Sequence, residues 1–148
     1  MNEKLYSIIN KLKEKNIDFK IIELTKMEKD NTEDKLNHKK NFKTLVVKKE
    51  NNSFFAMLLP VDKKIDLKKL EKRFNSKLNL ASYEEIKNVI NVEPGAVCPL
   101  DLNIPLIIDN SVFRFERINI GSGDQMYGIE VNPRDILKIT NAKTSNVT

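Results

Sequence analysis

The sequence has few of the residues that bind metals or cross-link small proteins. Its 148 residues include one cysteine, Cys98, one histidine, His38, and no tryptophan. One cysteine cannot form a disulfide within the chain, and together with a single histidine it leaves almost no soft ligands for a transition metal. We therefore expect neither a metal site nor a bound cofactor.

Long apolar runs are also missing. No stretch approaches the roughly 20 apolar residues needed to cross a bilayer, and the first residues begin an amphipathic pattern instead of the apolar core of a signal peptide. Hydrophobic residues make up 40% of the chain and charged residues 32%, an ordinary globular composition. We expect a cytoplasmic protein without membrane partners, folded as one domain over residues 1–148.

Short helices and strands are predicted throughout. Ser82 followed three residues later by Glu85 is a capping box, and Asn132-Pro133 is typical of a helix start. The charged segment 25–40 is expected to be a mobile connection and residues 141–148 a frayed tail. The predicted helices cover residues 3–15, 66–74, 82–90 and 133–139, and the predicted strands cover 19–23, 43–49, 53–59, 78–80, 104–109, 113–120 and 127–131. Two hairpins interrupt a strict βαβ order, so we expect a mixed α/β fold with a curled sheet or barrel surrounded by short helices.

Two segments are the best candidates for a ligand site. Lys43 opens the apolar run Lys43–Val47, and the turn Gly95–Pro99 begins with glycine and ends with proline. Glycine lets a ligand approach the backbone closely, and proline limits how the turn can collapse. Consecutive outward N–H groups in such a turn would donate hydrogen bonds to a carbonyl oxygen. Each pattern alone also fits an ordinary turn or a surface lysine. Together they predict that the Lys43 amine faces the backbone of the turn across a narrow crevice, with an acyl bond of the ligand between them.

Other chemistries are less well supported. Cys98 would need a base or an electropositive setting to act as a thiolate, and the only histidine lies in the charged connection. Asp109 and Asp124 could point into one cleft, but both also lie in ordinary turn sequences. Neither a phosphate-binding P-loop nor a dinucleotide fingerprint occurs. The basic cluster at residues 62–77 could attract phosphates or could serve solubility alone.

Several segments together resemble the trans-editing family of YbaK-like and ProX-type aminoacyl-tRNA deacylases and the insertion domain of bacterial prolyl-tRNA synthetase. The resemblance covers residues 3–140. The segments that carry it are Phe42–Val47, Leu58–Asp66, Leu80–Glu85, the G-x-x-x-P motif within Pro94–Pro99, Ile108–Val112 and the glycine loop Ile120–Gly123.

The resemblance implies hydrolysis of a mischarged aminoacyl-tRNA, of the tRNA(Pro) type, with the tRNA acceptor end and prolyl-tRNA synthetase as partners. It implies that Lys43 holds the phosphate or ribose of the terminal adenosine. It also implies that the backbone starting at Gly95 contacts the scissile ester and its water. The expected catalytic residues are Lys43, Gly95 and Asp109. The expected substrate-binding residues are Thr44, Ala96, Pro99, Gly121, Ser122, Asp124 and Tyr127.

One departure from the family pattern concerns the histidine that members of the synthetase-insertion type place shortly after the glycine loop. This sequence has Asp124–Gly128 there and no histidine. We therefore do not expect the alanine-specific pocket of that subtype, and we expect Tyr127 to occupy the position of the histidine side chain. Two other hypotheses stay open: a non-catalytic module that binds tRNA or an aminoacyl nucleotide and regulates a synthetase, and a thiol enzyme that uses Cys98.

Overall fold

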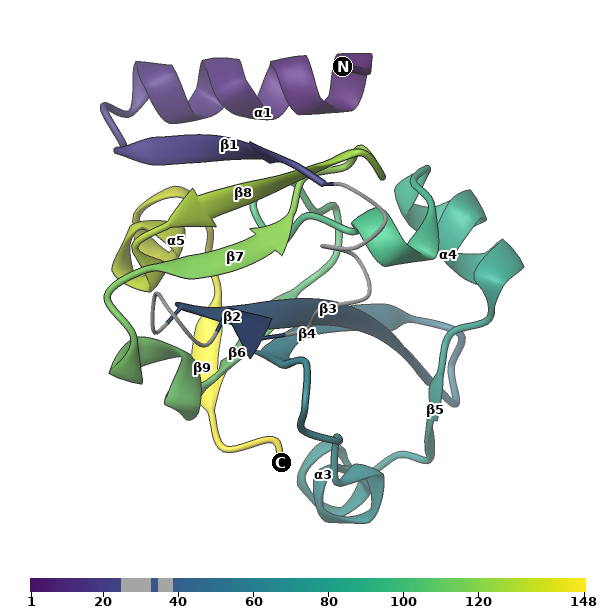
Figure 1. Ribbon diagram of the computed structural model, residues 1–148. Helices are drawn as coiled ribbons and strands as arrows, with labels where there is room; N and C mark the ends of the chain where they lie inside the picture. The colour runs from purple at the N-terminus through teal and green to yellow at the C-terminus, as the bar shows by residue number, and fades with distance from the viewer. Residues whose placement is uncertain (25–32, 35–38) are drawn as a thin grey trace.

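A single curled sheet of nine strands with short helices around it makes up the described part of the chain (Figure 1). The computed structural model describes residues 1–24, 33–34 and 39–148, so most of the expected connection at residues 25–40 lies outside it. The helices are α1 Glu3–Glu14, α3 Leu67–Phe74, α4 Tyr83–Ile90 and α5 Pro133–Ile139, and the 3-10 turns are η1 Pro94–Ala96 and η2 Asn110–Arg114. The strands are β1 Phe19–Glu23, β2 Glu33–Asp34, β3 Lys39–Lys49, β4 Phe54–Pro60, β5 Leu78–Leu80, β6 Leu106–Asp109, β7 Ile118–Gly121, β8 Tyr127–Val131 and β9 Lys143–Ser145. The predicted mixed α/β class is confirmed.

The sheet mixes parallel and antiparallel neighbours. Its order is β1-β8-β7-β3-β4-β6-β9, and β2 and β5 also pair with β3. The pairs β1–β8, β7–β8 and β3–β4 are antiparallel, whereas β3–β7, β4–β6 and β6–β9 are parallel. Because β3 has four partners along its length, it holds the sheet together.

The helices begin where their capping residues predict. The capping box is complete, since the Ser82 hydroxyl accepts from the Glu85 N–H and the Glu85 carboxylate accepts from the Ser82 N–H. The Asn132 side chain caps α5 by accepting from Arg134 N. Each such cap satisfies an N–H group that the helix itself cannot.

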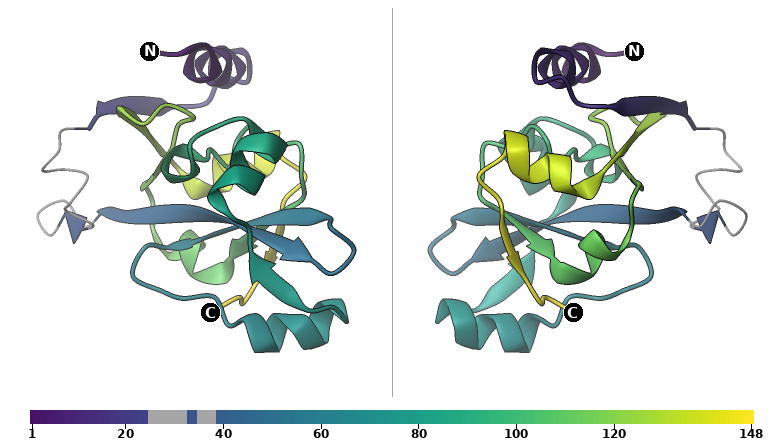
Figure 2. Two further views of the ribbon diagram at one scale, coloured as in Figure 1. Left: turned by 90° about the vertical axis from the view of Figure 1, so that its right-hand side faces the viewer. Right: turned by 90° about the vertical axis from the view of Figure 1, so that its left-hand side faces the viewer.

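Three apolar clusters fill the space between the sheet and the helices. The largest joins α1 residues to the inner sheet face, where Phe42 of β3 and Leu58 of β4 lie. The second lies on the other face of β3 and β4 and packs Val47 and Leu59 against Leu70 of α3. This division follows from the strand pleat, which points successive side chains to opposite faces. In the views of Figures 1 and 2, α1 and α3 lie at opposite ends of the molecule.

Several predicted boundaries were wrong. Strand β3 begins at Lys39 rather than at residue 43. Residues 110–114 form the 3-10 turn η2 instead of the start of a strand at 113, because the Asp109 side chain accepts from Ser111 N and closes the turn. Strand β6 begins at Leu106, after Pro105, rather than at residue 104. Residues 141–148 are not frayed, since β9 pairs with β6 and Val147 is fully buried in the second cluster.

One edge of β3 lacks a neighbouring strand along part of its length. Strand β7 pairs with Lys40 and Asn41, and β5 pairs with β3 only from Val47 onward. Ala81 N donates to Val46 O over 2.8 Å just before β5 takes over. Within the described residues, the ladders therefore leave positions 42–45 without a strand on the edge opposite β4, and the sheet splits there.

In the part of the chain that the structure covers, no helix is both long enough and apolar enough to span a bilayer.

Candidate functional site

The turn Gly95–Pro99 lies beside the split in the sheet. Its first half is η1, closed by a 2.8 Å hydrogen bond from Ala96 N to Glu93 O. Val97 packs against Val46 of β3 in the third apolar cluster, which attaches the turn to the face of β3 that Thr44 shares. Gly95 is exposed, and a Cβ built on it would meet nothing within 4 Å. The fold therefore does not require glycine at this position.

The glycine loop at residues 121–124 holds the turn from one side. Ala96 O accepts a 2.7 Å hydrogen bond from Gly123 N. The Val97 carbonyl oxygen points at Gly121, where an added Cβ would collide with it and would stand 3.0 Å from Val97 C. Only glycine allows β7 to end this close to the turn.

These two carbonyls fix the direction of two amides. All peptide bonds in the described chain are trans, and in a trans peptide the C=O and the following N–H point in opposite directions. Since the carbonyls of Ala96 and Val97 point to the glycine loop, the N–H groups of Val97 and Cys98 point away from it. Among the described residues, these two N–H groups and that of Gly95 donate no hydrogen bond. The turn thus holds consecutive N–H groups without a hydrogen-bond partner on a fixed backbone, in which Gly95 is exposed and Val97 and Cys98 are buried.

The glycine loop is itself held by internal hydrogen bonds. The hydroxyl of the fully buried Ser122 accepts from Asp124 N and shares its one proton between the carbonyl oxygens of Tyr127, at 2.6 Å, and Asp124, at 2.9 Å. The Asp124 carboxylate accepts from Asn2 N over 2.9 Å and from Met126 N over 3.0 Å. The contacts of Ser122 and Asp124 therefore support the loop and join it to the start of α1. They give no evidence that either side chain contacts a ligand.

Helix α4 positions the start of the turn, which the sequence alone did not indicate. Tyr83 donates a hydrogen bond to the Glu93 carboxylate, and Lys87 forms a 3.2 Å ion pair with it. These two interactions hold the pKa of Glu93 below its usual value. The i,i+4 spacing of Tyr83 and Lys87 shows that they share a face of α4, but no local signal shows that Glu93 lies against that face.

Lys43 and Thr44 lie on opposite faces of β3 at the split. Lys43 pairs with Leu59, a member of the second cluster, so its side chain leaves on the α3 side and is partly exposed. Thr44 points to the other face, where Val46 contacts the turn. Its hydroxyl is buried and has no hydrogen-bond partner. The two adjacent residues thus flank the open edge of β3 from both sides.

Asp109 has a structural task that its sequence position did not reveal. Its side chain is 2% exposed, one carboxylate oxygen accepts from Val147 N over 3.0 Å, and the other accepts from the N–H and hydroxyl of Ser111. Both oxygens are therefore used to hold the C-terminal segment and to start η2. Within the described part of the chain, no hydrogen bond joins Asp109 to the turn or the glycine loop, so the predicted catalytic role gains no support.

Three further predicted residues contribute through packing. Cys98 is buried, and burial raises the pKa of its thiol to about 12, so the thiolate needed for nucleophilic catalysis is not formed near neutral pH. Pro99 is buried beside it. Tyr127 is partly buried and packs against the largest cluster. His38 lies outside the described residues.

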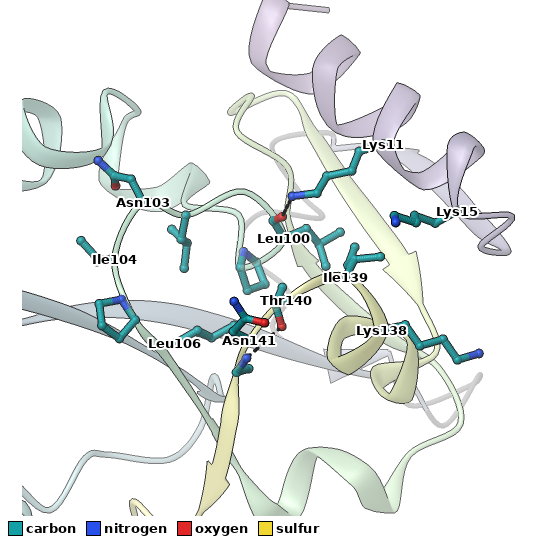
Figure 3. A pocket seen from close by; sticks show the side chains of 14 residues that line it. Lys11, Lys15, Leu100, Asn103, Ile104, Leu106, Lys138, Ile139, Thr140 and Asn141 are labelled. Atoms are coloured by element: carbon teal, nitrogen blue, oxygen red, sulfur yellow. Dashed lines mark hydrogen bonds between the residues drawn. The ribbon is translucent and has the colours of Figure 1, made fainter.

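A cavity of about 640 Å³ lies beyond Pro99, between α1, α5 and the segment 99–106 (Figure 3). Lys11 reaches across one wall and donates a 3.0 Å hydrogen bond to Leu100 O. Pro99 is the one predicted site residue among those that line it. Apart from Pro99, the last residue of the turn, the cavity shares no lining residue with the turn, the glycine loop or residues 42–45 of β3.

Known structures share this fold. One, described as a hypothetical protein, superimposes with a TM-score of 0.81 at 20% identity, covering 95% of this chain and 97% of that chain. Another, described as a candidate trans-editing enzyme for prolyl-tRNA synthetase, gives a TM-score of 0.80 at 18% identity and covers 100% of this chain and 98% of that chain. At these identities the likeness shows the fold alone, a mixed α/β domain.

Sequence comparison identifies the family. Residues 25–139 match the model of the aminoacyl-tRNA editing domain, and the chain belongs to this family. A proline–tRNA ligase of Francisella philomiragia subsp. philomiragia is 27% identical over 118 residues, which cover 74% of this chain. The match spans 21% of that ligase, about a fifth of its length. The predicted relationship to editing domains and to prolyl-tRNA synthetase is confirmed.

Proposed function

We propose that this protein is an aminoacyl-tRNA deacylase that acts in trans on a mischarged tRNA of the tRNA(Pro) type. Membership of the editing family supports the reaction class. The observation that carries the proposal is the rigid turn at residues 95–98, whose free N–H groups lie next to an exposed glycine. Such donors suit the oxygen of an ester that becomes negatively charged as water attacks it.

The reaction needs little from side chains. The oxygen of a water molecule attacks the ester carbonyl carbon, and the carbonyl oxygen takes up negative charge between the N–H groups of Val97 and Cys98. The tetrahedral intermediate then breaks its bond to the ribose oxygen, which takes a proton. The products are the free amino acid and the tRNA. Removal of one donor from such a site typically slows catalysis by about 10²–10³-fold, so correctly placed amides supply a large part of the rate.

We assign the proton transfer to no side chain among the described residues. Asp109 and Asp124, the two carboxylates that the sequence suggested, both serve as hydrogen-bond acceptors within the fold. A neighbouring ribose hydroxyl of the substrate can instead orient the attacking water. A substrate that lacks this hydroxyl should be hydrolysed much more slowly, and unchanged turnover would exclude such assistance.

Lys43 would hold the acceptor end from the α3 side of β3. Its amine carries a positive charge, and no ion pair within the described residues involves it. Within the described residues no strand pairs with this edge of β3 at residues 42–45, and the proposal places the substrate across that edge. Its phosphate would face Lys43, while its ester would face the turn on the other side.

The test is a deacylation screen with Ala-, Cys- and Ser-tRNA(Pro). Wild-type protein should release the amino acid from at least one of them. Lys43→Ala should lose nearly all of this activity while keeping its fold, and Lys13→Ala, which removes an exposed lysine of α1, should keep it. A folded Lys43→Ala protein with full activity contradicts the assignment of this lysine.

A binding module without catalysis is the second candidate function, favoured by the engagement of Asp109 and Asp124 within the fold. It predicts saturable binding of aminoacyl-tRNA without release of amino acid in the same screen. The proposed protein partner is prolyl-tRNA synthetase. One relative is itself a proline–tRNA ligase, and one structural neighbour is a candidate trans-editing enzyme for prolyl-tRNA synthetase. Co-sedimentation of the two proteins with and without tRNA would test it.

A further inference from the structure

Cationic residues gather on and next to α3, which lies at the end of the molecule opposite α1 (Figures 1 and 2). We call this group the α3 cationic face, and all of its members except the partly exposed Lys69 are exposed. It consists of Lys63, Lys64, Lys68, Lys69, Lys72, Arg73 and Lys77. Among the described residues, none of these side chains takes part in an ion pair.

The acidic residues close by do not neutralise this face. Asp66 caps α3 by accepting from Lys69 N, and Glu71 accepts from Leu78 N at the start of β5. These two carboxylates are directed at backbone groups. With Asp62 also counted, residues 62–77 hold seven cations against three carboxylates, a net charge of +4.

The arrangement costs the free protein some stability. Lys68 and Lys72 are four residues apart on one helix, as are Lys69 and Arg73, and like charges at this spacing destabilise a helix. An eight-residue helix has little stability of its own, and α3 is held by Leu70 and Phe74 in the second cluster. A surface that serves solubility alone does not require cations gathered on one short helix.

This surface is continuous with the position of Lys43. Val61 N donates to Asn41 O, and Lys63 N donates to Pro60 O, so the turn that carries Lys63 and Lys64 follows directly from the pairing of β4 with the start of β3. Lys43 leaves β3 on the same side as α3. Cations therefore extend from Lys43 through this turn to α3.

We propose that the α3 cationic face binds the phosphate backbone of the tRNA whose acceptor end reaches Lys43. This inference rests on the proposed function for the identity of the RNA. The chemistry recognised is a row of phosphodiesters, for which lysines act as point charges without reading bases. Binding through this face should therefore depend strongly on salt and little on nucleotide sequence.

The experiment compares two double variants that lose the same charge. Lys68→Gln with Lys72→Gln removes two cations from the face, and Lys13→Gln with Lys15→Gln removes two exposed cations from the far end of the molecule. Binding of deacylated tRNA is measured between about 50 and 300 mM NaCl, with circular dichroism as the check on folding. Deacylated tRNA is used because it cannot be turned over, so binding is read separately from hydrolysis.

If each lysine neutralises one phosphate, the α3 variant should lower the slope of log K against log salt by about 1.8, and binding near 0.1 M salt should weaken more than tenfold. The α1 variant should match wild type. Equal effects of both variants, or no effect of either, overturn the proposal. Binding to vesicles of equal phosphatidylserine and phosphatidylcholine is measured in parallel. If the α3 variant loses binding to these vesicles but binds tRNA as wild type does, the proposal is overturned in favour of a membrane surface.

The outcomes separate this inference from the proposed function. If wild type binds tRNA through the face but releases no amino acid, the deacylase assignment fails and the docking surface stands. If wild type deacylates and the α3 variant binds and reacts normally, the docking surface fails and the deacylase stands.

Discussion

Two glycines near the turn should respond in opposite ways to the same substitution. An added Cβ at Gly95 meets nothing within 4 Å, whereas one at Gly121 collides with the Val97 carbonyl oxygen and lies 3.2 Å from Ala96 C. Neither residue has a positive φ, so backbone strain does not complicate the comparison. Gly95→Ala and Gly121→Ala therefore separate ligand access from packing.

The expected sizes follow from these contacts. Forcing a methyl group against the rigid Val97 carbonyl should cost about 1–3 kcal/mol, a fall in Tm of roughly 2–12 °C for a chain of this length. Gly95→Ala should keep or raise the free energy of unfolding, by about 0.4–1 kcal/mol, because alanine restricts the unfolded chain. Its methyl group would nevertheless keep an ester from the free amides, and a displacement of about 1 Å can cost roughly 100-fold in rate.

The assay combines thermal unfolding with single-turnover deacylation of the substrate found in the screen. Gly95→Ala should melt at or slightly above wild type and react about 100-fold more slowly. Gly121→Ala should melt lower and lose activity because the turn moves. A Gly95→Ala protein with unimpaired rate would refute the idea that the ester approaches this backbone. A Gly121→Ala protein as stable as wild type would refute the packing argument.

Two other substitutions test the buried polar groups. Asp109→Asn removes the charge that accepts from Val147 N and Ser111, and the free energy of unfolding in urea should fall by about 1–3 kcal/mol; unchanged stability with lost deacylation would instead restore its predicted catalytic role. Thr44→Val replaces a buried hydroxyl without a partner by a methyl group, so stability should rise by about 1 kcal/mol and Tm by about 2–4 °C. If the hydroxyl contacts substrate, deacylation should slow in this variant, and a lower Tm would contradict the reading of the site.

Local signals in the sequence located the elements well. The Ser82–Glu85 capping box, the Asn132-Pro133 start and the hairpin of β3 and β4 all depend on residues within a few positions of each other. Such signals act before tertiary structure forms and survive in it. They therefore predicted the helices and most strands to within a few residues.

The tasks of polar side chains could not be predicted in the same way. Asp109 lies in a turn sequence that fits a cleft as well as a cap, and its partner Val147 is 38 positions away. Ser122 in a glycine loop suggests a ligand contact, yet its hydroxyl is fully buried among carbonyl oxygens of its own loop. A hydrogen bond across 38 positions decided the first case, and burial of the hydroxyl within its own loop decided the second. No spacing rule includes either.

The register of β3 against β4 decides to which face of the sheet the Lys43 side chain points. It places Lys43 and the turn on different faces of β3. From the sequence, Lys43 and Gly95 were expected to face each other across a crevice. The pairing of Lys43 with Leu59 instead turns the lysine toward α3, while Val46 contacts the turn from the opposite face. A shift by one residue would exchange these faces. The edge of β3 at residues 42–45, which no described strand pairs with, reconciles the two observations. An RNA strand that follows the α3 cationic face reaches Lys43 first. If it then passes over this edge, its terminal ester meets the N–H groups of the turn.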